Sequence, residues 1–225
     1  MSLVQGVGPI RASSWIRRFG SAAAVFRAGA GGLAAAGVPP ALAAALVSSE
    51  SAAAADREIE RARESSITFR FAGLDEMPPE LEAIDAPPLV LTARGRIELI
   101  GPRARMAVVG ARTPTPYGER QAARFARALA ASGVVVVSGF ARGVDRAAHV
   151  AALESGGDTI AVLGSGLARP YPADAPDLLR SIETRGLVLS ELPIDASASK
   201  ASFPRRNRIL SGLCRAVLVV EAGLA

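Results

Sequence analysis

Cysteine, histidine, lysine and tryptophan each occur once in this chain of 225 residues, and aromatic residues make up only 4% of it. A single cysteine, Cys214, excludes an intrachain disulfide and a zinc cluster built from cysteines. Cys214 lies in an apolar segment, which predicts a buried core thiol. The lone His149 lies inside a predicted helix, so we expect a packed or hydrogen-bonded side chain rather than a catalytic base. The sequence therefore predicts no metal site.

No apolar run is long enough to cross a membrane. The Ala-rich stretch from Ser21 to Ser48 is interrupted by Arg27 and by Pro39-Pro40. No basic-then-apolar signal opens the chain. These absences, together with the scarcity of cysteine, predict a reducing, cytoplasmic setting without a membrane partner.

Half of the residues are hydrophobic, and the formal net charge is +5. With so few aromatic residues, the core must be built mainly from Ala, Val and Leu. The positive charge modestly favours a polyanionic partner. Among 26 basic residues only Lys200 is a lysine, which makes its position worth following. The length leaves room for one full α/β domain and a smaller one.

Residues 106–225 alternate apolar segments with helical patterns. Five such strands predict an α/β fold with a Rossmann-like, doubly wound parallel sheet. The expected strands are Met106–Gly110, Val134–Ser138, Thr159–Leu163, Leu187–Glu191 and Val217–Glu221. The expected helices are Tyr117–Ser132, Val144–Ser155, Asp174–Arg185 and Pro204–Leu213. Because no helix follows the fifth strand to cover the sheet, we expect this domain to be incomplete at its C-terminus.

Residues 1–66 predict a small N-terminal helical domain, SAM-like or helix-hairpin-helix-like. Helices are expected at Ile10–Phe19, from Ser21 to about Gly37, at Pro40–Glu50 and at Ala55–Ser66. The turn Gly6-Val7-Gly8-Pro9 can present backbone N–H groups to a phosphate, and a plain helical turn is an equally open interpretation.

Residues 67–105 predict a linker with small strands. The segment Ile67–Pro88 is rich in proline and is expected to be irregular. Leu89–Ala93 and Arg96–Ile100 flank Arg94-Gly95, and we expect them to form a hairpin.

Four loops of the main domain are expected to meet at the carboxyl edge of the sheet, where ligands bind in open α/β folds. In chain order they are Gly110–Thr113, Ser138–Gly143, Gly164–Arg169 and Lys200–Arg208. Each loop combines Gly or Ser with a basic residue, which offers backbone donors and a cation to an anion. The candidate DNA-binding residues are Gly110, Arg112, Ser138, Gly139, Arg142, Gly164, Gly166, Lys200, Phe203, Arg205, Arg206, Asn207 and Arg208. A plain β-to-α turn at Ser138-Gly139 remains an alternative.

The fourth loop, Lys200–Arg208, is the most informative. Pro204 sets the first turn of a helix, and three arginines follow where the helix dipole disfavours cations. A sequence that goes against a local preference, here that of a helix N-terminus for negative charge, often marks a functional site. A bound phosphate would relieve the repulsion, and Phe203 offers a stacking face worth ~1–3 kcal/mol per base. The competing interpretation is that the arginines pair with carboxylates and that Asn207 and Arg208 brace the loop.

Cofactor binding and catalysis have little support in the sequence. Gly164-Ser165-Gly166 follows a strand, but Arg169 replaces the third glycine of a dinucleotide-binding fingerprint. There are no paired carboxylates, no metal-ligand cluster and no nucleophile elbow. We therefore predict no cofactor, no metal and no enzymatic activity.

Several motifs of residues 106–225 together resemble the DNA-processing protein A family, also called Smf. They are Val109-Gly110-Ala111-Arg112 with Tyr117-Gly118, Val137-Ser138-Gly139 with Gly143-Val144-Asp145 and Ala148-His149, Thr159–Gly164 with Gly166-Leu167 and Tyr171-Pro172, Ser190-Glu191 with Pro193, Phe203-Pro204 with Arg206–Ile209 and Gly212-Leu213, and Val219–Ala222. Gly6–Pro9 and Arg18–Ser21 resemble the family's N-terminal helical domain more weakly.

The resemblance implies a protein that binds single-stranded DNA in a basic pocket of an extended Rossmann-like domain. Such a protein protects incoming strands and loads a RecA-type recombinase onto them in natural transformation and recombination. Arg112, Lys200 and Phe203 match the family's DNA-contacting arginine, lysine and aromatic residue. Ala111 replaces the commoner serine. The resemblance ends before the family's next segment, which contributes to dimerisation, so it implies a possible homodimer for the full-length family and leaves self-association of this chain open.

The same fold also occurs in phosphoribohydrolases that resemble lysine decarboxylases. Those enzymes carry a Pro-Gly-Gly-x-Gly-Thr run followed by a glutamate. The nearest equivalent here, Glu221-Ala222-Gly223, lacks the run. A nucleotide-binding phosphoribohydrolase-like enzyme, or a nucleotide sensor, is therefore the alternative function.

Overall fold

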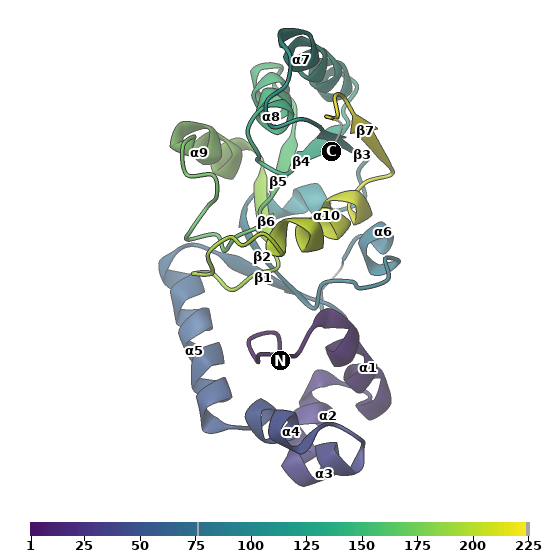
Figure 1. The fold of residues 1–225 in the computed structure, drawn as a ribbon, viewed down its shortest axis with the longest axis vertical. Helices are drawn as coiled ribbons and strands as arrows, with labels where there is room; N and C mark the ends of the chain where they lie inside the picture. Colours follow the sequence, from purple (N-terminus) through teal and green to yellow (C-terminus); the bar gives the residue numbers. More distant parts are fainter. Residues whose placement is uncertain (76, 224–225) are drawn as a thin grey trace.

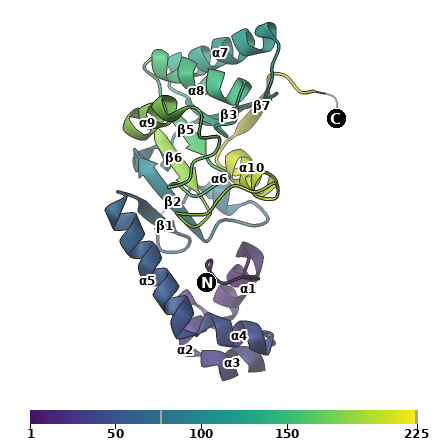
Figure 2. The ribbon, with the colours of Figure 1, turned by 60° about the vertical axis from the view of Figure 1, so that its left-hand side comes forward.

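The computed structural model describes residues 1–75 and 77–223. A bundle of short helices forms one end of the elongated molecule, and a sheet with its covering helices forms the other (Figures 1 and 2). The long helix α5 (Ser49–Glu64) leads from the bundle to the sheet. No helix in the described ranges is long and apolar enough to span a membrane.

The bundle consists of α1 (Pro9–Phe19), α2 (Ala22–Arg27), α3 (Gly29–Ala35), α4 (Pro40–Leu46) and the first part of α5. Val25, Leu33 and Leu46 are buried at its centre. The structure differs from the sequence prediction in two places. The helix expected from Ser21 is split into α2 and α3, because Gly29 has a φ of +64°. The helix α5 begins earlier than expected, because the Ser48 hydroxyl caps it by accepting from the Ser51 amide at 3.1 Å.

The sheet has seven strands, in the order β1-β2-β6-β5-β4-β3-β7. The strands are β1 (Thr68–Phe71), β2 (Val90–Gly95), β3 (Arg105–Val109), β4 (Val135–Ser138), β5 (Thr159–Val162), β6 (Leu187–Ser190) and β7 (Ala216–Val219). The five strands from β6 to β7 in this order are parallel, which confirms the predicted α/β fold. The strands β1 and β2 extend the sheet with antiparallel pairs.

The predicted hairpin is wrong. The strand β2 pairs with β1 and β6, with Ala93 opposite Thr68 on one side and Leu189 on the other. Residues Ile97–Ile100 form a 3₁₀ turn, η1, in which Leu99 and Ile100 are buried in the core. Gly95 does not turn the chain back on itself. A Cβ there would come within 2.5 Å of the Gly186 carbonyl oxygen, so this close approach of backbones requires glycine.

Helices cover both faces of the sheet. The helices α7 (Pro116–Ala131), α8 (Val144–Glu154) and α9 (Pro176–Arg185) lie on one face (Figure 2). The other face packs against α10 (Ser202–Gly212), α6 (Pro79–Glu82) and η1. Side chains alternate along β4: Val136 packs with α7 and α8, whereas Val135 and Val137 pack with α10 and α6. The strands β4, β5 and β6 are therefore buried on both sides, as their continuous apolar runs predicted, whereas the edge strand β7 exposes Val217 and Val219.

The strand order reverses at β3. The chain moves from β3 through β4 and β5 to β6 on one side, and β7 then returns to pair with the other side of β3. Open α/β sheets bind ligands outside the carboxyl ends of strands near such a reversal. The loops after β3, β4 and β5 and the start of α10 lie at that edge.

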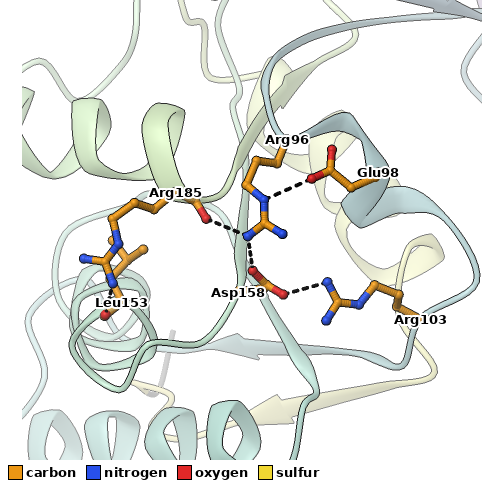
Figure 3. Close-up of polar contacts among 6 residues, drawn as sticks. All are labelled: Arg96, Glu98, Arg103, Leu153, Asp158 and Arg185. Carbon is orange, nitrogen blue, oxygen red and sulfur yellow. Dashed lines mark hydrogen bonds and ion pairs between the residues drawn. The ribbon is translucent and has the colours of Figure 1, made fainter.

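The opposite, amino edge is fixed by one carboxylate (Figure 3). Asp158, just before β5, accepts from the guanidinium groups of Arg96 and Arg103, the latter at 2.6 Å. Arg96 also donates to Glu98 at 3.0 Å and to the Arg185 carbonyl at 3.2 Å. These contacts join β2, the segment before β3, β5 and α9 at the edge away from the candidate site.

Candidate nucleic-acid interface

Three residues from three segments form a cluster at the carboxyl edge, here called the Phe203 cluster. Phe203, in the first turn of α10, lies against Gly164, where a Cβ would come within 2.8 Å of the ring. The guanidinium carbon of Arg112 lies over the Phe203 ring, 5.2 Å from its centroid. The Tyr171 ring lies 5.8 Å from that of Phe203, tilted by 48°. Arg112 and Tyr171 are exposed and Phe203 is half-buried, so the cluster presents two aromatic rings and a cation at the surface.

Ser202 fixes the start of α10 against the loop after β5. Its hydroxyl donates to the Gly164 carbonyl oxygen at 2.6 Å and accepts from the Ser199 amide at 3.0 Å. The Ser199 hydroxyl in turn accepts from the Ser202 amide at 3.2 Å. These bonds shape the turn that carries Lys200, whose side chain is exposed. Two of the loops predicted to converge are therefore in direct contact.

Arg206 lies inside the protein rather than on its surface. Its side chain donates to the carbonyl oxygens of Gly139, at 2.6 Å, and Val162, and to Asn207 Oδ1 at 3.1 Å. Burial lowers the pKa of Arg206, and the nearby Asp145 carboxylate opposes that shift. Arg206 thus joins α10 to the ends of β4 and β5, while Asn207 is exposed and accepts from it.

The loop after β4 is organised by an internal carboxylate. Asp145, in the first turn of α8, accepts from the amides of Gly139 and Ala141, both at 3.1 Å. Burial raises the pKa of Asp145. The Ser138 hydroxyl is buried and donates to the Val108 carbonyl oxygen at 2.7 Å. Ser138 and Gly139 therefore shape the edge from within, and the loop amides predicted to meet an anion already bind Asp145.

Two of the candidate arginines pair with carboxylates. Arg208 forms an ion pair with both oxygens of Glu191 and donates to the Ala86 carbonyl oxygen. Arg142 donates to Asp174 at 2.8 Å. Hydrogen bonds from Arg146 and then Arg142 lower the pKa of Asp174 to about 2. The carboxylate-pairing interpretation that the sequence left open for the fourth loop therefore applies to Arg208, and Arg142 in the loop after β4 pairs in the same way.

Besides Arg142, which pairs with Asp174, three cations of the predicted set are exposed: Arg112, Lys200 and Arg205. Within the described ranges none of the three forms an ion pair. The remaining predicted residues, Gly110 and Gly166, lie at the same edge against neighbouring backbone. Gly166 donates to the Ala196 carbonyl oxygen at 2.8 Å, and Gly110 lies against the Glu221 carbonyl oxygen. The glycines therefore bring the loops close together.

His149 and Cys214 are buried, as predicted. The His149 Nδ1 lies 2.7 Å from the Thr159 hydroxyl, which itself donates to the Val136 carbonyl oxygen at 2.8 Å. Nδ1 is therefore the protonated nitrogen. Burial lowers the pKa of His149 to about 3, and burial raises that of Cys214 to about 12. Neither group is placed to act as a base or a nucleophile on a bound molecule.

Glu221 has a structural partner at the start of α7. Its carboxylate accepts from the Thr115 amide at 2.9 Å and the Thr115 hydroxyl at 2.7 Å, and these bonds lower its pKa. The Thr115 hydroxyl also caps α7 by accepting from the Gly118 amide at 3.1 Å. No group of three or more His, Cys, Asp or Glu side chains that could hold a metal ion occurs among residues 1–75 and 77–223.

Sequence reasoning missed the partners that hold this edge together. Tyr171 had a signal in the Tyr171-Pro172 motif, but only the fold places its ring beside Phe203. Asp145 lies in the first turn of the helix expected at Val144–Ser155, but nothing in the sequence showed that it binds the preceding loop. Ser202 and Asp174 carried no signal, because their partners Gly164 and Arg142 are far away in the sequence.

The fold and this edge define a Rossmann-type α/β protein with aromatic and cationic side chains at the switch point of its sheet. The model of the family described as DNA recombination-mediator protein A matches residues 68–225, and the chain belongs to that family. It is 43% identical over 150 residues to protein Smf of Synechocystis, covering 65% of this chain and 38% of the relative. It is 45% identical over 148 residues to protein Smf of Escherichia coli, covering 65% and 39%. The chain thus spans about two fifths of the length of these relatives.

Two solved structures resemble the chain. One is the X-ray structure of DNA processing protein A from Streptococcus pneumoniae, with a TM-score of 0.71 and 33% identity, covering 80% of this chain and 62% of that one. The other describes the single-stranded DNA binding mode of DNA processing protein A from Helicobacter pylori. It has a TM-score of 0.64 and 33% identity and covers 70% of each chain.

Proposed function

We propose that this chain binds single-stranded DNA at the carboxyl edge of its sheet. The observation that carries the proposal is the Phe203 cluster, in which an aromatic face lies beside the guanidinium of Arg112. Unpaired bases stack on such a face, and exposed cations meet the phosphates. Lys200 and Arg205 supply two more cations at the same edge. The similar Helicobacter pylori structure describes a single-stranded DNA binding mode, and this supports the same substrate class here.

Within this proposal the candidate residues divide by role. Arg112, Lys200 and Arg205 contact the strand, because they are exposed at the edge and form no ion pair in the described ranges, and Phe203 offers its ring beside Arg112. The remaining members shape the loops, bring them together, or are bound to a neighbouring side chain, as Arg142 is to Asp174 and Asn207 is to Arg206. They are Gly110, Ser138, Gly139, Arg142, Gly164, Gly166, Arg206, Asn207 and Arg208. The edge would act without cofactor or catalysis.

The proposed cellular role is cytoplasmic DNA processing, in which the bound strand is handed to a RecA-type recombinase during transformation or recombination. Its support is membership of a family described as recombination mediators. A pull-down of the recombinase with and without single-stranded DNA tests this step, and retention that is equal to a bead-only control would contradict it.

DNA binding is tested by anisotropy of labelled oligo-dT and of a duplex at two salt concentrations. We expect preference for the single strand, because stacking needs unpaired bases. Replacing Arg112 or Lys200 by Ala should weaken binding and reduce the salt slope by about 0.7 per phosphate contact. Arg27→Ala, in the helical bundle and exposed, is the matched control. Affinity and slope that are unchanged in both edge variants would refute the site.

A phosphoribohydrolase-like activity has weaker support, because Glu221, its nearest candidate carboxylate, binds Thr115. Incubation with nucleoside monophosphates tests it: base release above that of a boiled control would favour the enzyme.

A further inference from the structure

A cleft of about 270 Å³ lies between the helical bundle and the sheet. The N-terminal loop, which carries the Gly6-Val7-Gly8-Pro9 turn, forms one wall and faces the sheet domain in both views (Figures 1 and 2). The start of β2, the segment after β6 and the first turn of α10 form the opposite wall. The lining residues of that wall are Leu89, Val90, Glu191, Leu192, Pro193 and Arg205.

This cleft adjoins the proposed DNA site through shared lining residues. A smaller hollow beside the Phe203 cluster is lined by Gly164 and Ser202, the residues that seat Phe203. The same hollow is also lined by Glu191, Leu192 and Arg205, which line the cleft as well. One wall therefore leads from the aromatic face, past Arg205, to the N-terminal loop.

The chemistry of the cleft suits a nucleotide unit. Glu191 and Arg205 are its charged lining residues. Both Glu191 oxygens bind Arg208, so the charge left to meet a ligand is the exposed Arg205 cation. Leu3, Val4 and Leu192 offer apolar surface to a base. Ser2 and Gln5 of the N-terminal loop are exposed polar residues, and they can form hydrogen bonds with a ligand without adding charge to the cleft.

The two units are tied together, so the cleft is formed before any ligand arrives. Glu58 of α5 accepts from the Ile194 amide at 2.6 Å, and Arg61 pairs with Asp195 at 3.2 Å. Ile194 directly follows the cleft residue Pro193. A preformed site spares a ligand the cost of ordering two mobile parts.

We infer that a single strand held at the Phe203 cluster continues past Arg205 into this cleft, where the N-terminal loop binds a further nucleotide. The inference rests on the proposed function and extends it, because it gives the helical bundle a direct part in binding. Arg205 then serves as the junction between the two parts of the path. A short strand would occupy the edge alone, whereas a longer one would reach both parts.

The test compares Gln5→Glu with Ala23→Glu, an exposed position of α2 that does not line the cleft. Both changes add one negative charge to the bundle. Affinity is measured for oligo-dT of about 6 and about 20 nucleotides. We expect Gln5→Glu to weaken binding of the long strand about fivefold and to leave the short strand unaffected, because the new carboxylate repels a phosphate in the cleft. Ala23→Glu should behave as wild type with both strands.

A second measurement places the strand directly. Oligo-dT carrying 5-iodouracil near one end or the other is photo-crosslinked to the wild-type chain, and the tryptic peptide from Met1 to Arg11 is sought. We expect crosslinks to this peptide from one end of the long strand. Equal long-strand affinity of Gln5→Glu and wild type, with no such crosslink, would overturn the inference while leaving the edge site intact. A wild-type chain that binds neither strand would overturn the proposed function and the inference together.

Discussion

The guanidinium of Arg112 lies over the Phe203 ring at 5.2 Å from its centroid, joining the loop after β3 to the first turn of α10. We predict that Phe203→Leu weakens binding of oligo-dT by about 5- to 150-fold, since base stacking on an aromatic is worth ~1–3 kcal/mol. Leucine keeps apolar contact with Gly164 but removes the flat face. Anisotropy titration measures the effect, and an unchanged melting midpoint serves as the control. Wild-type affinity in this variant would remove the stacking role.

Replacing one or the other of two adjacent arginines of α10 by Met should affect different properties, stability in one case and DNA binding in the other. Arg206 is buried and donates to the Gly139 and Val162 carbonyl oxygens, whereas Arg205 is exposed. Arg206→Met leaves both oxygens without that donor and removes the cation near Asp145, so we predict a loss of about 3–5 kcal/mol in the free energy of unfolding. Arg205→Met should change stability by less than about 0.5 kcal/mol but weaken DNA binding.

Urea unfolding and oligo-dT titration of the two methionine variants separate these roles. Both variants lose one positive charge, so each is the other's control. If the two had the same unfolding midpoint, Arg206 would not be the brace that its contacts describe.

The parallel sheet was predictable because its strands are nearly continuous apolar runs, such as Val134–Val137, separated by helical patterns. Burial on both faces produces that pattern, and it is local. The antiparallel strands β1 and β2 were not predictable in the same way. Their partners are set by long-range pairing, as where Ala93 meets Leu189. The apolar residues of η1 also resembled a strand, since a short apolar run does not distinguish a strand from a buried turn.

The sequence predicted that the loops of the candidate site meet, but not which of their side chains face outward. Glycine and serine at the ends of strands indicated where the loops meet. The sequence did not show which arginines would turn inward. Arg206 and Arg208 differ from Arg205 only in the direction that each faces on α10, and their partners Gly139 and Glu191 come from other loops. Arg205 faces the cleft shared with the N-terminal loop.

His149 should make stability fall in mild acid. Its folded-state pKa of about 3 lies below the ordinary 6.5, so the unfolded chain takes up a proton that the buried ring does not. Stability is therefore lost as the pH falls below about 6.5, by about 2 kcal/mol at pH 5. His149→Asn keeps an amide donor near Thr159 and cannot titrate.

We expect His149→Asn to be less stable than wild type at pH 7 but to lose less stability between pH 7 and pH 5. The raised pKa of Asp145 has the opposite sign, because the folded state binds that proton more tightly as the pH falls. Asp145 is present in both chains, so the difference between them isolates His149. Parallel pH profiles would show that the His149 ring has the same pKa in the folded protein as in the unfolded chain.

Asp158 offers a test of stability that should not involve the DNA site. Its carboxylate binds Arg96 and Arg103 at the amino edge (Figure 3) and its side chain is 17% exposed, whereas both arginines are more open to solvent. Asp158→Asn keeps the size but removes the charge between two guanidinium groups. We predict a loss of about 1–2 kcal/mol in the free energy of unfolding, since hydrogen bonds to charged groups are strong and solvent screens the arginines.

The Asp158→Asn variant should bind oligo-dT with wild-type affinity below its melting transition. The amino edge lies at the opposite end of the parallel strands from the Phe203 cluster, so the change alters neither the stacking face nor the exposed cations there. Asp158→Asn also raises the net charge by one, which would slightly favour a polyanion through long-range attraction. Measuring affinity at two salt concentrations removes this contribution, because screening at high salt suppresses it. Weaker binding at both concentrations would mean that the two edges are coupled through the sheet.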